Sequence, residues 1–305
     1  MDLSIVGTMA LDTVETPFGN VKDALGGSGS YAGCAASFFA RPGLVGVVGE
    51  DFPEEHLASL RSRGIDTSGV ERAPGGTFRW GGRYETDVNV RTTLFTELNA
   101  LERFDPKLPD DYKKTKYLFL ANIEPGLQNK VLDQCGSLEF TILDTMNFWI
   151  EGYRAELDRA LKRVDAVMLN DEEARMLTGR GNLRAAAAAA LEMGPRIVVV
   201  KKGEHGAMMF TKSSHFALPG YPLETLKDPT GAGDSFAGGF IGYVASRGSA
   251  DEETLRQAMV AGTATASYCC EDFSIDRFRT LNISDVAARA ASVGEAVRFS
   301  PLEWK

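Results

Sequence analysis

A run of small residues in the C-terminal half constrains the fold more than any other stretch of the chain. Lys227 to Phe240 begins as a turn, because Pro229 has no backbone N–H and a fixed φ. Gly231 and Gly233 then allow the backbone to approach a ligand closely. From about Gly233 the apolar residues have the spacing of a helix that faces a core, namely Phe236, Phe240, Ile241 and Val244.

A tight turn that opens a helix predicts an anion site. The first N–H groups of a helix have no partner within it, and the helix dipole adds positive potential there. We therefore expect an anion site where this helix begins, next to Gly231 and Gly233. The dipole also favours an ionised Asp234. An ionised base beside an anion hole suits attack by a hydroxyl on a phosphoryl group.

The order of residues in this turn indicates a family. Residues 228–235, Asp-Pro-Thr-Gly-Ala-Gly-Asp-Ser, closely resemble the C-terminal signature of the PfkB family of carbohydrate kinases, also called the ribokinase-like family. The resemblance covers nearly the whole chain. It implies a three-layer α/β/α fold with a mostly parallel sheet and a small β-strand lid, in one domain over 1–305. It further implies ATP-dependent phosphorylation of a hydroxyl of a small sugar, with Asp234 as the general base. The anion hole that it implies is formed by four backbone amides, those of Gly231, Ala232, Gly233 and Asp234.

Composition limits the partners. The 305 residues carry a net charge of −9, which argues against a surface for nucleic acid or for an anionic membrane. No apolar run is long enough to cross a bilayer, and the first residues lack the pattern of a signal peptide. The four cysteines and three histidines have no metal-ligand spacing. We therefore expect free thiols in a cytoplasmic protein.

The N-terminal region supplies the residues that we expect to hold the acceptor. Asp12 follows a predicted strand over 3–7 and resembles the family's substrate-binding Asp; a carboxylate can accept two hydrogen bonds from a diol. Gly26 and Gly27 precede a helix predicted over 32–40 and resemble the family's Gly-Gly signature. Tyr31 stands where many members have an Asn that contacts the sugar, which argues against ribose as the substrate.

Two segments are expected to form the lid. Residues 13–25 have the composition of a hairpin, and residues 77–97 alternate as antiparallel strands that cover one face. The apolar side chains of that face are Phe78, Trp80, Tyr84, Val88, Val90 and Leu94. A lid excludes water, which competes for the phosphoryl group. An edge extension of the main sheet is the alternative, and a homodimer would form through the lid.

Polar residues are expected at the carboxyl ends of two central strands. The strands are predicted at 117–121 and 140–144, and ligands of open α/β sheets bind at such ends. The side chains concerned are Asn122, Glu124, Asp144 and Asn147. Among them, we assign Asn122 and Asn147 to the acceptor. Phe148-Trp149 stands where sugar kinases of the family often have Pro-x-Arg, so the pocket wall is changed.

The second half supplies the expected nucleotide site. Asn170 and Glu173 follow a strand predicted over 164–169 and match the family's Asn-x-x-Glu motif. The motif implies that Glu173 arranges Mg²⁺ through its waters, which suits the preference of Mg²⁺ for oxygen ligands and retained water. An acidic first helical turn is also common for dipole reasons alone. The resemblance assigns further nucleotide contacts to Lys201, Gly203, Gly206, Thr230 and Thr263.

Two of these assignments are less direct. Lys201 or its neighbour Lys202 either contacts phosphate or is merely solvated. Thr263 lies on a helix predicted over 255–268, and in resembling kinases this region forms a wall of the adenine site.

The resemblance also implies a third cofactor, and it is compatible with three functions. Asp228 and Thr230 match positions that hold K⁺ in several resembling kinases, so K⁺ joins ATP and Mg²⁺ as an expected cofactor. A sugar kinase is the first function. A nucleoside kinase is the second, with a base stacked on four aromatic residues, Tyr31, Trp80, Phe148 and Trp149. A non-catalytic nucleotide-binding relative is the third, and the intact turn around Asp234 argues against it.

Overall fold

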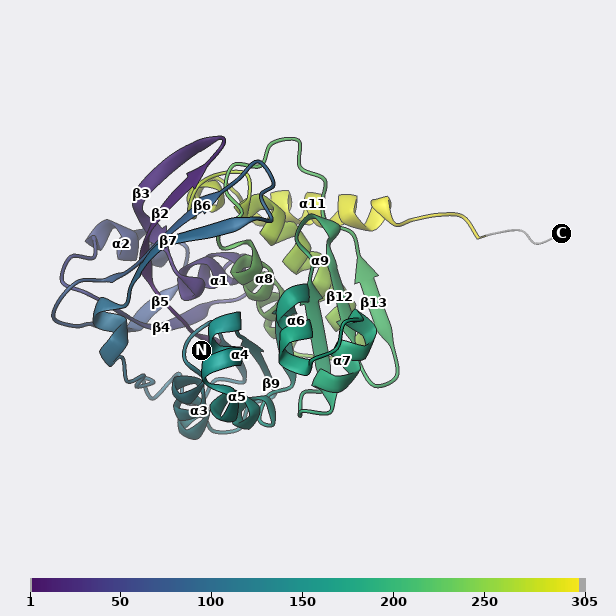
Figure 1. Cartoon of the computed structure of the whole chain (residues 1–305), viewed down its shortest axis with the longest axis horizontal. Helices are drawn as coiled ribbons and strands as arrows, with labels where there is room; N and C mark the ends of the chain where they lie inside the picture. The colour runs from purple at the N-terminus through teal and green to yellow at the C-terminus, as the bar shows by residue number, and fades with distance from the viewer. Residues whose placement is uncertain (1, 302–305) are drawn as a thin grey trace.

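The computed structural model describes residues 2–301, and a nine-stranded sheet forms its centre (Figure 1). The strands of this sheet are β1 (Leu3–Val6), β4 (Pro42–Val48), β5 (Asp66–Arg72), β8 (Tyr117–Leu120), β9 (Phe140–Asp144), β10 (Ala166–Asn170), β11 (Ile197–Lys201), β12 (Ala207–Phe210) and β13 (His215–Leu218). Their order is β13-β12-β11-β10-β9-β8-β1-β4-β5. The strands from β11 to β5 pair in parallel, and β12 and β13 add an antiparallel edge.

Helices cover both faces of the sheet, as the three-layer expectation requires. One face packs against α1 (Ser28–Ala36), α2 (Glu54–Ser62), α8 (Ala232–Arg247), α9 (Glu252–Cys269), α10 (Asp276–Arg279) and α11 (Ile283–Ala296). The other packs against α3 (Pro125–Gln134), α4 (Asn147–Gly152), α5 (Arg154–Leu161), α6 (Asp171–Thr178) and α7 (Leu183–Leu191). The central strands are continuous apolar runs because both of their faces are buried.

A second sheet of four strands stands apart from the large one, on the upper left in Figure 1. Its strands are β2 (Ala10–Thr16), β3 (Gly19–Gly26), β6 (Phe78–Tyr84) and β7 (Arg91–Glu97), in the order β3-β2-β6-β7. The segments expected to form a lid therefore form a separate sheet and do not extend the main one. Only two of its three pairings are antiparallel, because β2 and β6 run parallel.

Two local expectations were wrong. Helix α1 begins at Ser28, before the expected start, because Gly27 has a φ of 92° and caps it. Val90 and Leu94 do not lie on a covered face: they are 51% and 39% exposed, and all seven residues of the edge strand β7 are exposed. Asp12 follows the first strand as expected and lies within β2.

Two helix ends follow local chemistry visible in the sequence. Helix α6 ends at Gly179, whose φ of 66° is the left-handed conformation that favours glycine. Helix α8 begins after Gly231, which has a φ of 76°. Over residues 2–301, none of the helices is both long enough and apolar enough to cross a membrane.

Candidate active site

A cavity of about 1630 Å³ contains nearly all of the residues selected from the sequence. It is lined by the carboxyl ends of the parallel strands, by the start of α8 and by the lid sheet. Pockets for one small ligand measure roughly 300–1,000 Å³. This cavity therefore has room for two ligands together. Of the assigned site residues, Gly26 and Asp228 are absent from its lining.

The turn before α8 offers amides to an anion, though one fewer than expected. Thr230 N–H donates to Asp228 Oδ1 at 2.8 Å, which fixes the start of the turn. Ala232 N–H donates to the carbonyl of Pro229 at 3.2 Å and is not available. The amides of Gly231 and Gly233 have no acceptor within the described part of the chain, and the Asp234 amide interacts with its own carboxyl. The turn therefore offers an anion three amides, those of Gly231, Gly233 and Asp234.

Asp234 lies in the first turn of α8 and lines the cavity. The pKa of its carboxyl is raised to about 7, first by burial and then by the charge of Asp144, while the nearby Lys201 opposes the rise. A carboxyl that titrates near neutral pH can accept a proton efficiently, since the best general bases have a pKa near the working pH.

Lys201 is a buried cation at the anion hole. Its Nζ forms an ion pair with Asp144 Oδ2 at 2.7 Å, and the two side chains are only 16% and 5% exposed. The same Nζ lies 3.2 Å from the point that a Cβ on Gly233 would occupy. Burial lowers its pKa, but Asp144 and Glu173 outweigh burial, so the pKa is raised and Lys201 remains charged. A merely solvated Lys201 is therefore excluded.

Asn170 and Glu173 are tied to each other at the start of α6. Asn170 Oδ1 accepts from Glu173 N–H, and Glu173 Oε2 accepts from Asn170 N–H, both at 2.7 Å. This reciprocal capping box satisfies two amides that the helix leaves free. Burial, followed by Asp144, raises the pKa of Glu173 to about 7, and Lys201 opposes the rise.

These contacts leave Glu173 suited to an indirect metal contact. Glu173 lines the cavity, and its second oxygen, Oε1, has no hydrogen-bond donor among residues 2–301. The described residues contain no cluster of three or more His, Cys, Asp or Glu that could hold a metal alone. One carboxylate beside a phosphate site fits Mg²⁺, which keeps several waters.

Asp228 is a buried carboxylate with one unused oxygen. The side chain is 1% exposed, and Oδ2 has no hydrogen-bond partner among the described residues. Burial raises its pKa to about 6, while hydrogen bonds from Thr230 oppose the rise. Leaving such an oxygen unpaired is costly, and a cation would satisfy it. The arrangement at Asp228 and Thr230 therefore fits a monovalent cation.

The acceptor end of the cavity begins with Asp12, which is 4% exposed. Its pKa is raised to about 8, first by burial and then by the carboxyls of Asp228 and Asp234. A Cβ on Gly26 would lie 1.9 Å from Asp12 Oδ2, and one on Gly27 would lie 2.5 Å from the carbonyl of Thr8. The two glycines thus make room for Asp12 and for the tight turn, and Gly26 does not reach the cavity.

Tyr31 lies beneath the signature turn. It is 2% exposed, and a Cβ on Gly231 would lie 2.3 Å from its Cγ. The ring therefore packs against the turn and has little surface left on which a base could stack.

An aromatic cluster forms the wall opposite the lid. Phe148 and Trp149 of α4 meet at 4.9 Å, and Trp149 meets Tyr153 at 5.1 Å, both edge to face. Trp149 Nε1 donates to Asn122 Oδ1 at 2.8 Å, which orients the amide. Trp80 of the lid and Asn147 line the same cavity. The sequence indicated Phe148 and Trp149 but gave no sign of Tyr153.

The residues expected to contact the nucleotide also line the cavity. Gly203 and Gly206 have φ values of 55° and 85° and shape the turn after β11. Thr263 of α9 is 6% exposed and lines the cavity, and its hydroxyl donates to the carbonyl of Met259. Tyr221 also lines the cavity, and the sequence analysis missed it because it lies in an irregular loop.

Comparison with known proteins agrees with this geometry. The pfkB family carbohydrate kinase model matches residues 5–276. A cytidine kinase of Thermococcus kodakarensis is 34% identical over 264 residues, 84% of this chain and 92% of that protein. A nucleoside kinase of Thermoplasma acidophilum is 26% identical over 88% of this chain and 85% of that protein.

A solved structure supports the fold over the same length. The nucleoside kinase of Methanocaldococcus jannaschii, an archaeal member of the ribokinase family, has a TM-score of 0.77 and 20% identity. The match covers 96% of this chain and 99% of that one. The family indicated by the signature turn is therefore confirmed. The chain belongs to the pfkB family of carbohydrate kinases and is a phosphotransferase with an alcohol group as acceptor.

Proposed function

We propose that this kinase phosphorylates a hydroxyl on the sugar of a nucleoside, with ATP as donor and cytidine as the first acceptor to test. The observation that carries the proposal is the aromatic wall of Phe148, Trp149 and Tyr153 in the acceptor end of the cavity. A sugar can pack only the C–H groups of one face on such a wall, whereas a planar base can stack on it over its whole ring. The similarity to a cytidine kinase supports the same choice.

The chain's own residues divide the reaction between them. Asp12 accepts hydrogen bonds from the sugar hydroxyls and places one of them toward Asp234. Asp234 removes the proton from that hydroxyl as it attacks the terminal phosphoryl group. The amides of Gly231, Gly233 and Asp234 stabilise the charge on the transferred group. Lys201 lies at the same place and adds a full positive charge in a site with little water.

Two further carboxylates, Glu173 and Asp228, are assigned to the metal ions. Mg²⁺, when bound, neutralises charge on the phosphates; Glu173 would hold it through water, and Asn170 fixes the orientation of Glu173. We assign K⁺ to Asp228 and Thr230, since Asp228 Oδ2 is buried without a partner. Activity should therefore rise when K⁺ replaces a bulky organic cation in the buffer. Equal rates in the two buffers would contradict the assignment of K⁺ to Asp228 and Thr230.

A panel of acceptors tests the proposal. ADP release is measured with cytidine, uridine, adenosine, free ribose, deoxyribose and fructose, and we expect the highest kcat/KM with a nucleoside. A higher kcat/KM with a free sugar would show a sugar kinase. ATP binding without turnover of any acceptor would show a non-catalytic relative.

A matched pair of variants tests the aromatic wall. Phe148 lines the cavity and is 57% exposed, whereas Phe18 is 58% exposed and lies outside it. Phe148→Ala should lower kcat/KM for the nucleoside by about tenfold, because stacking contributes roughly 1–3 kcal/mol per base. Phe18→Ala should leave it unchanged. Equal effects of the two variants would contradict a stacked base.

A homodimer through the lid is a further part of the proposal. All seven residues of β7 are exposed, and this outer strand carries Leu94 and Phe95 at 39% and 37% exposure. An exposed edge strand with apolar side chains is prone to pair with another copy. Light scattering should give twice the monomer mass, and Leu94→Lys should give the monomer. A wild-type monomer at every concentration would contradict the dimer.

We also propose a cytoplasmic location. Cys34, Cys135, Cys269 and Cys270 are all free thiols, and such thiols persist in reducing compartments. Fractionation of cells should recover the protein with cytoplasmic markers, and recovery outside that fraction would contradict the location.

A further inference from the structure

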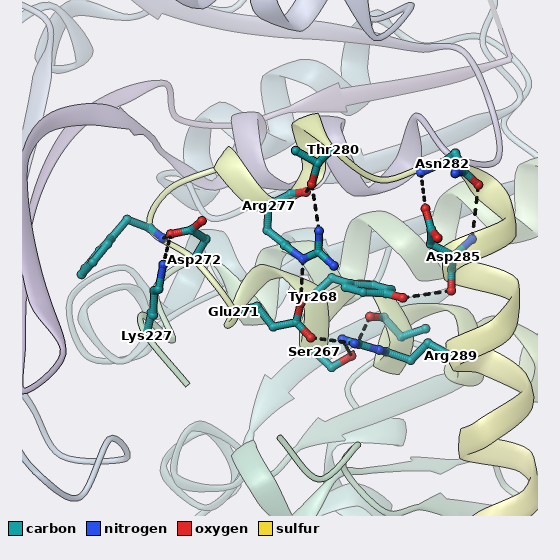
Figure 2. A network of polar contacts seen from close by, with 12 residues as sticks. Lys227, Ser267, Tyr268, Glu271, Asp272, Arg277, Thr280, Asn282, Asp285 and Arg289 are labelled. Atoms are coloured by element: carbon teal, nitrogen blue, oxygen red, sulfur yellow. Dashed lines mark hydrogen bonds and ion pairs between the residues drawn. The ribbon is translucent and has the colours of Figure 1, made fainter. Parts of the chain in front are cut away.

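The C-terminal helix α11 places one arginine behind the wall of the cavity. Figure 2 shows Arg289 beside Ser267, Tyr268 and Glu271, which belong to α9 and the segment that follows it. The Arg289 side chain is 11% exposed. Its guanidinium carbon lies 3.4 Å from the centre of the Tyr268 ring and 4.4 Å from the centre of the Tyr221 ring. Arg289 therefore stacks on two aromatic rings that come from different parts of the chain.

Polar contacts fix the guanidinium in place, as the dashed lines in Figure 2 show. Nη2 pairs with Glu271 Oε1 at 2.6 Å, and Nη1 donates to Ser267 Oγ at 3.2 Å. The other oxygen of Glu271, Oε2, accepts from Arg277 Nε at 2.7 Å. A planar guanidinium held on several sides loses little further freedom when a neighbouring group binds a ligand.

The residues that Arg289 contacts line the end of the cavity expected to receive the donor base. Tyr221 and Ser267 are part of the lining, and Arg289 is not. The acceptor approaches Asp234 from the side of Asp12. Because the attacking and leaving oxygens are roughly in line, the rest of the donor must extend past the anion hole in the opposite direction. The cavity there is bounded by α9 and the loop that carries Tyr221.

We propose that Arg289 is a positioning residue for the phosphoryl donor. It holds the Tyr221 ring and the Ser267 hydroxyl in the wall against which the base of the donor lies, without touching the donor. This role rests on the proposed use of ATP but not on the identity of the acceptor. The donor site is therefore completed by the last helix of the described chain.

Arg277 offers a matched control for Arg289. Both arginines pair with Glu271 and lie over the Tyr268 ring, Arg277 at 5.3 Å, but only Arg289 stacks on Tyr221 and donates to Ser267. Arg289→Met should raise the KM for ATP by about five- to thirtyfold, since a desolvated cation–π contact is worth up to roughly 2 kcal/mol. Its kcat and acceptor KM should stay near wild type. Arg277→Met should lower the melting temperature similarly and leave the KM for ATP unchanged.

A ligand that has the phosphates of ATP but no adenine distinguishes a positioning role of Arg289 from a general loss of structure. Calorimetry with inorganic tripolyphosphate should give the same affinity for the wild type and for Arg289→Met, whereas the affinity for ATP should fall. Tyr221→Leu should lower the affinity for ATP to the same extent. This variant tests the proposal if Arg289→Met fails to fold. Equal loss for both ligands, or an unchanged KM for ATP, would overturn the proposal. These binding measurements need no acceptor, so a wrong acceptor in the panel leaves them interpretable.

Discussion

At the scale of single residues, the active site concentrates buried charge. Four carboxyls have a raised pKa, chiefly through burial: Asp12, Glu173, Asp228 and Asp234. Lys201 is paired with a fifth carboxylate, Asp144, and also opposes the rise in the pKa of Glu173 and Asp234. The arrangement destabilises the empty protein and prepares it for phosphates and cations. Stability given up at a functional site in this way is a common trade-off.

The clearest residue-scale prediction concerns Asp234. Asp234→Asn removes the base while keeping nearly the same shape, so kcat should fall by about 10²–10⁴-fold. Steady-state kinetics measures the loss. Circular dichroism and ATP titration should match the wild type. A variant that keeps most of the wild-type kcat would exclude Asp234 as the base.

Asp12 gives a prediction about stability and pH. In the unfolded chain its pKa is near the ordinary value of ~3.9, and in the folded protein burial raises it to about 8. The folded state binds the proton more tightly, so the stability from this group is complete below about pH 4 and is lost as the pH rises toward 8. Asp12→Asn should therefore raise the melting temperature more at pH 8 than at pH 5.

A control for this prediction is Asp111→Asn, because the Asp111 side chain is 86% exposed. It should change the melting temperature by the same small amount at both pH values. If Asp12→Asn behaves like this control, the neutral form of Asp12 is not favoured by folding.

At the scale of elements, the lid is connected to the signature turn. Thr230 Oγ1 donates to the hydroxyl of Tyr84 at 3.1 Å, although 146 residues separate them. Tyr84 is on β6 and is 8% exposed. The turn that presents the anion hole is therefore held from two sides, by the lid above and by Tyr31 beneath.

This connection predicts coupling between Tyr84 and Thr230. Tyr84→Phe removes only a hydroxyl, and a neutral hydrogen bond is worth about 0.5–1.5 kcal/mol, so kcat should fall by about two- to tenfold. Thr230→Val should have a similar effect, and the double variant should be little worse than either. Kinetics of the four proteins measures the coupling. Fully additive losses would mean that the two groups act independently.

Elements with strong local chemistry could be predicted from the sequence. The positions of Asn170 and Glu173 at the start of α6, and of Gly231 before α8, follow from turn and capping preferences. The exposure of β7 could not be predicted, because its residues alternate in sequence as a half-covered strand does, whereas both faces of this edge strand are exposed in the fold. Nor could the role of Arg289, because its aromatic partners come from distant parts of the chain.

At the scale of the whole molecule, the cavity is lined by residues of both sheets. Asp12 and Trp80 belong to the small sheet, and Asp144 and Asn170 belong to the large one. All four residues line the cavity. A change in the angle between the sheets would therefore change the access of water and the alignment of the hydroxyl with Asp234.

Acceptor binding should close the small sheet over the large one. Hydrogen exchange over residues 77–97 should slow when the verified acceptor binds, and Trp80 fluorescence should change. Because the chain has three tryptophans, the Trp80→Phe variant shows whether the fluorescence change comes from Trp80. Hydrolysis of ATP without acceptor should be slow, and Asp12→Ala should raise the acceptor KM and lower kcat. A rate of hydrogen exchange over residues 77–97 that does not change when the acceptor binds would contradict closure.

Because Tyr31 lies directly beneath Gly231, the phosphate site joins residues made early and late during translation. All nine residues of α1 are buried in the finished protein, and their partner α8 begins only at Ala232. Before α8 is made, α1 can pack on β1 and β4 but lacks the helix that covers its remaining face. Such long-range pairing forms slowly and leaves apolar surface open to aggregation. Chains that end before residue 228 should therefore be inactive and prone to aggregate, because they lack both the signature turn and the partner of α1.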